Sequence, residues 1–465
     1  MAGGGLFRQS RCSKLPRTLG DHFGALTQGE LFLNNLIQGG SAESRPVGGA
    51  AASAGELQSG GNSAGPPSPA PVEHLPGVHA LRACAALAVF TGHSLDMSAL
   101  WLPLPKDTVV DIANVFLLGL PLFYIVSAFS LMHSTRGHTG ASNWVVNFYL
   151  KRFWRIAPMF YTMMIVDSIY SYSVLHIHPS RFEFGLDMLF INNLFPGLTS
   201  SAVYAGWSVS VEMLFYLVFP LIVTRLTTIK RGLVFAAAMI FVSEASRIYL
   251  DTVHEHFGTY GDWCVVTYLQ HFALGTLAYL VAERLRLRWA GAGPPSLRTL
   301  FLRHAAFALG LLGLVIVIST FHSELKAFLK IDSTLCAVVF ALVVVWFTAL
   351  RIPGVGWAPI QFLGERSYSL YLVHLLFLYI LYGQVFMTRI GTKPAFANIV
   401  YHFFQPWLGG WAILPTLVLN YMPITLAATI SYALIEKPGM DFGRKIRTML
   451  RKRLASNTMV ASSFN

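Results

Sequence analysis

The chain has 465 residues, of which 54% are hydrophobic and 12% are charged, and its mean hydropathy is +0.54. These values exclude an ordinary soluble domain and indicate an integral membrane protein. The formal net charge is +12, but cationic loops are a general property of membrane proteins, so we expect no nucleic-acid partner. The four cysteines show no paired spacing, which predicts neither a disulfide framework nor a metal site.

Three regions follow from composition. Residues 1–75 are rich in Gly, Ala, Ser and Pro, which predicts a disordered cytoplasmic tail because such a segment buries too little apolar surface to fold. Residues 76–445 form a membrane domain. Residues 446–465 form a basic cytoplasmic tail that could contact anionic membrane lipids.

The fold class is all-α and polytopic, with about ten transmembrane helices and both termini in the cytoplasm. The predicted spans are 79–97, 114–132, 157–175, 208–226, 232–250, 264–283, 304–320, 333–350, 367–386 and 413–435. Residues 186–199 are short and are interrupted by Asn192, Asn193 and Pro196, so we predict a re-entrant or interfacial segment there.

The distribution of basic residues supports this topology. With ten spans and a cytoplasmic N-terminus, the cytoplasmic loops and tails carry 26 Lys and Arg residues and the external loops carry six. The excess on one side is typical of cytoplasmic loops.

Arg82 and His93 lie on the first predicted span, eleven residues apart. Eleven residues return almost to the starting angle of a helix, so both side chains share one face and are separated by roughly 16 Å along the axis. Ionisable groups inside a membrane are costly, and they indicate a functional site.

The fourth predicted span opens with Ser208 and Glu212, which are four residues apart on one face. Depth along the two helices places Glu212 and His93 at similar levels near the outer surface. A carboxylate beside a histidine would orient the ring and raise its basicity, which suits a general base acting on a hydroxyl. The alternative is a buried contact between packed helices.

Basic residues gather at the inner end of the third span, where Lys151, Arg152 and Arg155 precede the helix that we expect Pro158 to begin. Together with Arg82 they could bind an anion that carries several phosphates. Anchoring at the inner membrane surface is the alternative, with equal weight for Lys151.

Other polar residues are expected to have structural roles. Glu436 and Lys437 are predicted to form a salt bridge or cap at the inner surface, where Pro438 ends the last helix. His271 is predicted to be a hydrogen-bonded packing residue. No partner can be assigned to Arg247 from the sequence.

Six sequence segments resemble the acyltransferase 3 family, which consists of membrane-bound enzymes that O-acylate bacterial surface and secreted glycans. They follow family order and spacing over about 79–445: Arg82 with His93, LPLFYIVSAFSL (Leu120 to Leu131), FYLKRFWRIAPMFY (Phe148 to Tyr161), WSVSVEMLFYLVFP (Trp207 to Pro220), FLGERSYSLYLVH (Phe362 to His374) and IEKP (Ile435 to Pro438). The departures are His79 and Ala80 for Asp-Gly, Ala128 for Gly, and Met213 for an acidic residue.

The resemblance implies roles for individual residues. His93 matches the catalytic histidine and Arg82 its basic partner, with Glu212 as the carboxylate of the site. Arg152 and Arg155 would bind the acyl donor, along a path lined by Tyr368, Tyr371 and His374; an ordinary polar seam between helices is the alternative for these last three. Trp207, Ser208 and Ser127 belong to motifs on the acceptor side or to structural motifs.

The implied reaction moves an acyl group, with acetyl as the first expectation, from cytoplasmic acyl-CoA to a carbohydrate or glycolipid acceptor across the bacterial inner membrane. No bound cofactor is expected. His93 would either deprotonate the acceptor hydroxyl or carry the acyl group itself. Family members often have an attached hydrolase-like domain, so a separate extracytoplasmic partner could take its place.

Two other classes of function stay open from the sequence. A secondary transporter could use His93 and Glu212 as a proton relay, although no paired halves with broken helices are visible. A membrane sensor without catalytic activity could share the scaffold, but intact His93 and Glu212 argue against it.

Overall fold

The computed structural model describes residues 75–99, 102–141, 143–177, 180–198, 201–253, 260–290, 296–310, 312, 332–350, 352, 354–385, 388–389 and 395–462. This part of the chain is almost entirely helical, so the all-α prediction is confirmed. The predicted N-terminal tail and most of the predicted span 304–320 lie outside the described residues.

The first half of the chain forms long helices and, between residues 180 and 198, a segment of shorter elements. Its elements are α2 (Pro76–Ser98), α3 (Lys106–Leu117), α4 (Gly119–Thr135), the 3-10 turn η1 (Arg136–His138), α5 (Trp144–Tyr170), the π-helical turn η2 (Ser171–Leu175), α6 (Arg181–Met188), the 3-10 turn η3 (Asn192–Leu194), α7 (Gly206–Arg225) and α8 (Ile229–Thr252).

The second half continues the bundle and adds one small ladder. Its elements are α10 (Tyr260–Trp263), α11 (Val265–Ala290), an unlabelled helix over residues 297–310, α13 (Asp332–Ala349), α14 (Ala358–Tyr382), β1 (Gln384–Val385), β2 (Thr388–Arg389), α15 (Phe396–Leu408), the 3-10 turn η4 (Gly409–Ala412), α16 (Ile413–Ser431), the π-helical turn η5 (Tyr432–Glu436) and α17 (Lys437–Ser462). The two strands pair antiparallel, with Gln384 opposite Arg389 and Val385 opposite Thr388.

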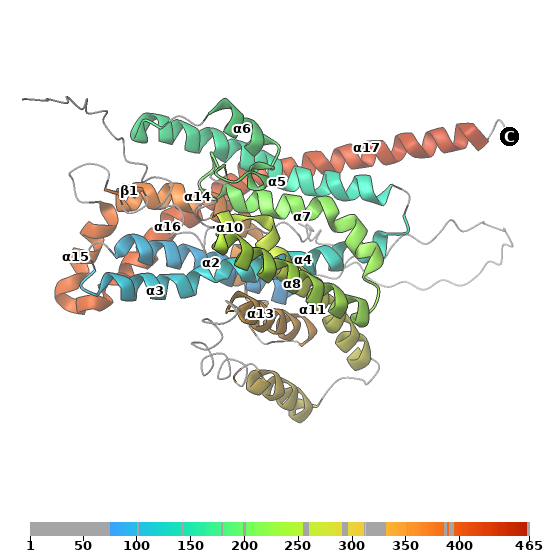
Figure 1. Ribbon diagram of the computed structural model, residues 1–465, viewed down its shortest axis with the longest axis horizontal. Helices are drawn as coiled ribbons and strands as arrows, with labels where there is room; N and C mark the ends of the chain where they lie inside the picture. Colours follow the sequence, from blue (N-terminus) through green and yellow to red (C-terminus); the bar gives the residue numbers. More distant parts are fainter. Residues whose placement is uncertain are drawn as a thin grey trace, which may run out of the picture.

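The long helices lie side by side along the long axis of the molecule, and α17 extends beyond the others at one end (Figure 1). Helix α2 packs against α3, α4 and α14, and α11 packs against α4, α8 and α13. The close approach of α2 and α14 requires Gly364, because a side chain at that position would collide with the backbone carbonyl of His79. The backbones of α2 and α14 are therefore in direct contact at this point.

Five stretches of the described helices are long and apolar enough to cross a membrane: Lys106–His138, Gly206–Arg225, Ile229–Thr252, Tyr260–Trp289 and Phe396–Arg453. Their length and composition indicate an integral membrane protein. Ser333–Ala349 is apolar but shorter. The count of ten spans and the cytoplasmic placement of both termini stay predictions.

Two predicted helix ends are wrong, and a proline explains each. Pro158 lies inside α5, and Pro438 lies near the start of α17, which continues to Ser462. Proline is tolerated inside membrane helices where neighbouring elements compensate for the lost backbone hydrogen bond. Here Gly439 and Gly443 allow α17 to approach Trp154 and Pro158 of α5 closely. The C-terminal tail is therefore helical up to Ser462.

Residues 186–199 do not form a membrane span, as predicted. The segment contains the end of α6 and the turn η3. Buried side chains fix it: Asp187 accepts a hydrogen bond from the Ala202 amide at 2.6 Å, and Asn193 donates to the carbonyl of Trp263 and accepts from the Val265 amide. These bonds satisfy backbone groups that a short irregular segment would leave open.

Candidate active site

Arg82 and His93 are both buried on α2, with 1% and 3% of their surface exposed. The guanidinium of Arg82 interacts electrostatically with Arg155, Glu436 and Glu212. The ring of His93 faces that of His374 on α14, with the ring centroids 5.5 Å apart. The two residues on this face of α2 therefore have different surroundings: Arg82 lies among charged groups and His93 lies beside a second histidine.

Arg155 on α5 is held by an ion pair in the interior. Its Nη1 lies 2.7 Å from Oε1 of Glu436, and the same nitrogen contacts the sulfur of Met440. Glu436 also accepts a hydrogen bond from the hydroxyl of Ser369 at 2.5 Å. The sequence predicted a salt bridge or cap of Glu436 at the inner surface. The structure has a salt bridge to Arg155, but this pair is buried among α5, α14 and η5.

Arg152 lies one turn earlier on α5 and is also buried. Its Nη2 donates to the Ser134 hydroxyl at 2.8 Å, and its guanidinium stacks over the rings of Phe148 and Tyr216 at 5.6 and 5.9 Å from their centroids. An arginine stacked on aromatic rings keeps its charge at reduced solvation. Arg82, Arg152 and Arg155 are called the inner arginine group below.

Glu212 on α7 is fully buried and belongs with the inner arginine group. Its Oε1 accepts hydrogen bonds from the hydroxyls of Ser127 and Tyr216, and its charge interacts with Arg152 and Arg82. Oε2 has no hydrogen-bond partner among the described residues. The predicted contact between Glu212 and His93 stays a prediction.

Helix α14 connects the inner arginine group to His93. The hydroxyl of Tyr368 donates to the carbonyl of Ile156 at 2.8 Å, and the hydroxyl of Tyr371 lies 3.1 Å from that of Ser208. His374 follows one turn later, beside His93. All three α14 side chains are buried, so the helix presents a continuous polar face within the bundle.

Trp207 has a packing role next to this face. Its ring lies 4.4 Å from that of Trp263 and 6.2 Å from that of Tyr268, measured between centroids. Ser208, the next residue, donates its hydroxyl hydrogen to the Ala205 carbonyl at 2.7 Å. The aromatic packing therefore fixes the start of α7, where Ser208 meets Tyr371.

Sequence reasoning missed three residues of the site. Tyr216 binds Glu212, Ser134 binds Arg152, and Ser369 binds Glu436. Tyr216 could have been found, because it lies four residues after Glu212 on the same helix face. The other two contacts join different helices, 18 and 67 residues apart, and leave no signal within one helix.

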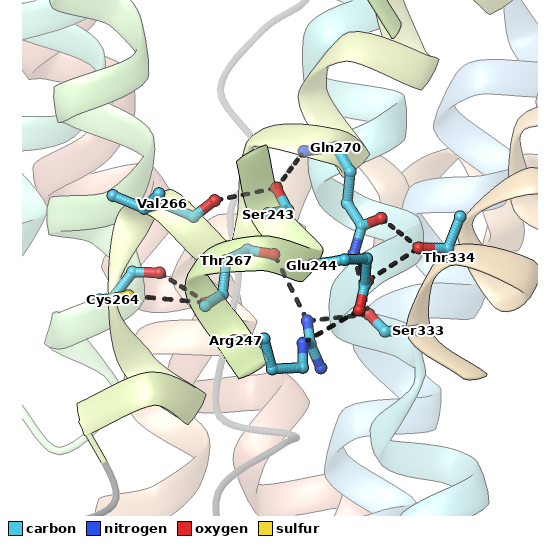
Figure 2. Close-up of polar contacts among 9 residues, drawn as sticks. All are labelled: Ser243, Glu244, Arg247, Cys264, Val266, Thr267, Gln270, Ser333 and Thr334. Carbon is cyan, nitrogen blue, oxygen red and sulfur yellow. Dashed lines mark hydrogen bonds and ion pairs between the residues drawn. The ribbon is translucent and has the colours of Figure 1, made fainter. Parts of the chain in front are cut away.

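Arg247 finds its partners in a second polar group on helices α8, α11 and α13 (Figure 2). It pairs with Glu244 at 3.8 Å and donates to the Ser333 hydroxyl at 3.3 Å, while Gln270 and Thr334 both donate to Glu244 at 2.9 and 2.8 Å. Ser243, Glu244, Arg247, Thr267, Gln270, Ser333 and Thr334 are called the three-helix cluster below.

His271 is fully buried on α11, and its ring packs 5.6 Å from that of Tyr268. This position agrees with the predicted packing role. Within the described residues, no group of three or more His, Cys, Asp and Glu side chains is placed to hold a metal ion.

Buried arginines, a buried carboxylate and two facing histidines inside an apolar helical bundle are typical of an enzyme site, and they make this polar face the candidate active site. The acyltransferase domain model of the acyltransferase 3 family matches residues 75–434. The chain therefore belongs to the acyltransferase 3 family.

A curated relative supports the same chemistry. The chain is 26% identical over 264 residues to ORF330 of the Acidianus two-tailed virus, which is named as an acetyltransferase; the alignment covers 56% of this chain and 72% of the viral protein. No solved structure matches the chain.

Proposed function

We propose that this acyltransferase moves an acetyl group from cytoplasmic acetyl-CoA to a hydroxyl of a cell-surface or exported glycan, in the bacterial inner membrane. The observation that carries this proposal is the polar face that joins the inner arginine group to His93 through a family-matched bundle. Membership of the family supports acyl transfer, while the donor, the acceptor and the membrane are our inference.

The inner arginine group suits the phosphates of acyl-CoA. Arginine forks bind phosphate oxygens in pairs, and three of them offer more positive charge than Glu212 and Glu436 together neutralise. Because Glu436 already occupies Arg155, donor phosphates would compete with this carboxylate for the guanidinium.

The path from the phosphates to the reacting carbon follows α2 and α14. Arg82 and His93 are separated by roughly 16 Å along α2, which suits the extended pantetheine arm. Tyr368 and Tyr371 line the same interval on α14, and the thioester would then lie at His93. The predicted roles of Arg152, Arg155, Tyr368 and Tyr371 in donor binding fit this arrangement.

His93 can act in either of two ways. As a general base it removes the proton of the acceptor hydroxyl, which then attacks the thioester carbon. As a nucleophile it takes the acyl group first and passes it to the hydroxyl. Both require an unprotonated imidazole, and both release the thiol of coenzyme A.

Replacement of His93 tests the proposal. The assay mixes the protein with radiolabelled acetyl-CoA and with membranes from source cells that lack the gene, and it measures the label transferred to those membranes. The His93→Ala variant should transfer no label, because no other group replaces the imidazole. Mass spectrometry of the labelled glycan would identify the ester and its position.

His271→Gln is the matched control, since it also removes a buried histidine but lies away from the polar face. It should retain transfer. Wild-type transfer by His93→Ala would contradict the assignment, and loss of the whole glycan from the surface of gene-deleted cells would favour a transporter.

A further inference from the structure

His374 has a defined hydrogen-bonding state. Its ring is buried, with 1% exposed, and Nδ1 contacts the backbone carbonyl of Tyr371 one turn earlier. A carbonyl oxygen only accepts hydrogen bonds, so Nδ1 carries the hydrogen and Nε2 of the neutral ring keeps its lone pair. The backbone of α14 therefore selects one tautomer of His374.

The lone pair of His374 is unused within the described part of the chain. Nε2 is buried and has no hydrogen-bond partner among those residues. A buried nitrogen without a partner costs free energy, and its persistence needs a reason. The ring of His374 lies beside those of Tyr371, with the centroids 5.2 Å apart, and His93, with the centroids 5.5 Å apart and the planes inclined by 36°. Of these two, only His93 has ring nitrogens that could share a proton with Nε2.

We propose that His374 is a positioning residue that accepts a hydrogen bond from the protonated His93 during acyl transfer, so that the two imidazoles hold one proton between them. This inference rests on the proposed function. It gives His374 a role in proton handling, where the family resemblance suggested contact with the acyl donor.

The proton balance of the step is complete. The O–H bond of the acceptor hydroxyl breaks, a new O–C ester bond forms, and the C–S bond of the thioester breaks. The proton passes to His93, where His374 stabilises it, and it then neutralises the departing thiolate of coenzyme A. No oxidant or further reactant is needed.

The surroundings favour a single shared proton. The charged or titratable groups on the elements packed against α14, and on α14 itself apart from His374, are His79, Arg82, Cys84, His93 and Asp96 on α2, Tyr149, Lys151, Arg152, Arg155, Tyr161, Asp167 and Tyr170 on α5, Tyr401 and His402 on α15, Tyr421 on α16, Tyr432 and Glu436 on η5, and Glu365, Arg366, Tyr368, Tyr371, Tyr379 and Tyr382 on α14. Arg155 and Glu436 neutralise each other. Two adjacent imidazoles repel when both are charged, so the pair titrates as a unit.

The test is the pH profile of His374→Asn. The asparagine amide can still donate to the Tyr371 carbonyl, but the substitution removes Nε2, the nitrogen that we propose accepts from His93. For this variant we expect kcat to fall about 100-fold, measured as acetyl transfer from acetyl-CoA to membranes of cells that lack the gene. Because protonated His93 loses a stabilising bond, the acidic limb of the profile should shift to lower pH by about one unit.

Two further variants keep the result interpretable. His374→Gln places a polar but non-titrating group near the position of Nε2 and should recover part of kcat, because it can still accept a hydrogen bond. Tyr421→Phe removes a hydroxyl bonded to Thr91 on the same helix α2, and should leave the limb unchanged.

Three outcomes would overturn the inference. An unshifted acidic limb in both His374 variants would show that this histidine only packs against its neighbours. A raised KM for acetyl-CoA with unchanged kcat would assign it to donor binding. Failure of the wild-type protein to transfer label would instead reject the proposed acetyl transfer, and with it this inference.

Discussion

The polar face around α2 and α14 and the three-helix cluster are both polar regions inside one helical bundle, but they differ in what faces the atoms that make no hydrogen bond. In the three-helix cluster, Gln270 and Thr334 bind each other and Glu244, and Arg247 reaches Glu244 and Ser333 (Figure 2). Nε of Arg247 and Oε2 of Glu244 make no hydrogen bond with any residue that the structure describes, but they lie 3.8 Å apart as an ion pair. In the active-site face, Nε2 of His374 and Oε2 of Glu212 lack hydrogen-bond partners among the described residues.

This difference assigns the three-helix cluster to helix packing and the active-site face to the reaction. A network whose charged groups are paired with each other holds helices together, and each interhelical hydrogen bond adds a modest amount to stability, about 0.6 kcal/mol on average. A buried polar atom without a partner lowers stability, so the fold retains it where a substrate or a proton in transit supplies the missing bond. We therefore expect mutations in the two regions to affect different measurements.

Glu212→Gln should give the largest effect. The amide keeps an oxygen for Ser127 and Tyr216 but removes the negative charge that faces Arg82 and Arg152, and we expect transfer to fall by about two to three orders of magnitude. The thermal melting midpoint of the detergent-solubilised protein should change little, because a neutral amide is cheaper to bury than a carboxylate.

Glu244→Gln in the three-helix cluster is the matched control for Glu212→Gln. It makes the same chemical change beside Arg247 and should leave transfer per folded molecule unchanged. Equal activity losses in the two variants would remove the distinction between the regions.

Arg247→Ala should have the next largest effect, and on stability alone. It leaves the charge of Glu244 without its ion-pair partner. Both side chains are partly exposed, 17% for Arg247 and 12% for Glu244. We expect a loss of about 2 kcal/mol in the free energy of unfolding, which is below the cost of breaking a fully buried pair. Thermal melting measures this, and a drop in kcat without a drop in melting temperature would contradict it.

The sequence predicted the all-helical fold correctly because apolar runs depend on local composition. It also placed Arg82, His93 and Glu212 inside helices, where the structure has them. The helices α2, α5 and α14, which carry most of the site, are absent from the five apolar candidate spans. Their polar side chains lower the hydropathy of the very segments that the bundle buries.

The partners of these residues could not be predicted so well. The pairing of Arg155 with Glu436 joins positions 281 residues apart, and the facing of His93 and His374 depends on how α2 and α14 are rotated. Helix depth alone suggested that Glu212 lies level with His93, whereas its described contacts are with Ser127, Tyr216 and the arginines. Proline positions also misled, because packing keeps Pro158 and Pro438 within helices.

The double substitution Glu244→Met with Arg247→Met should have the smallest effect, and it tests the comparison most sharply. If the ion pair only joins α8 to α11 and α13, two apolar side chains of similar volume should restore stability to within about 1 kcal/mol of the wild type. Transfer should stay at the wild-type level. A double variant that regains the wild-type melting temperature but still transfers less label would contradict this expectation. It would show that the three-helix cluster also serves the reaction, because the substitutions restore packing but not a charged contact to substrate.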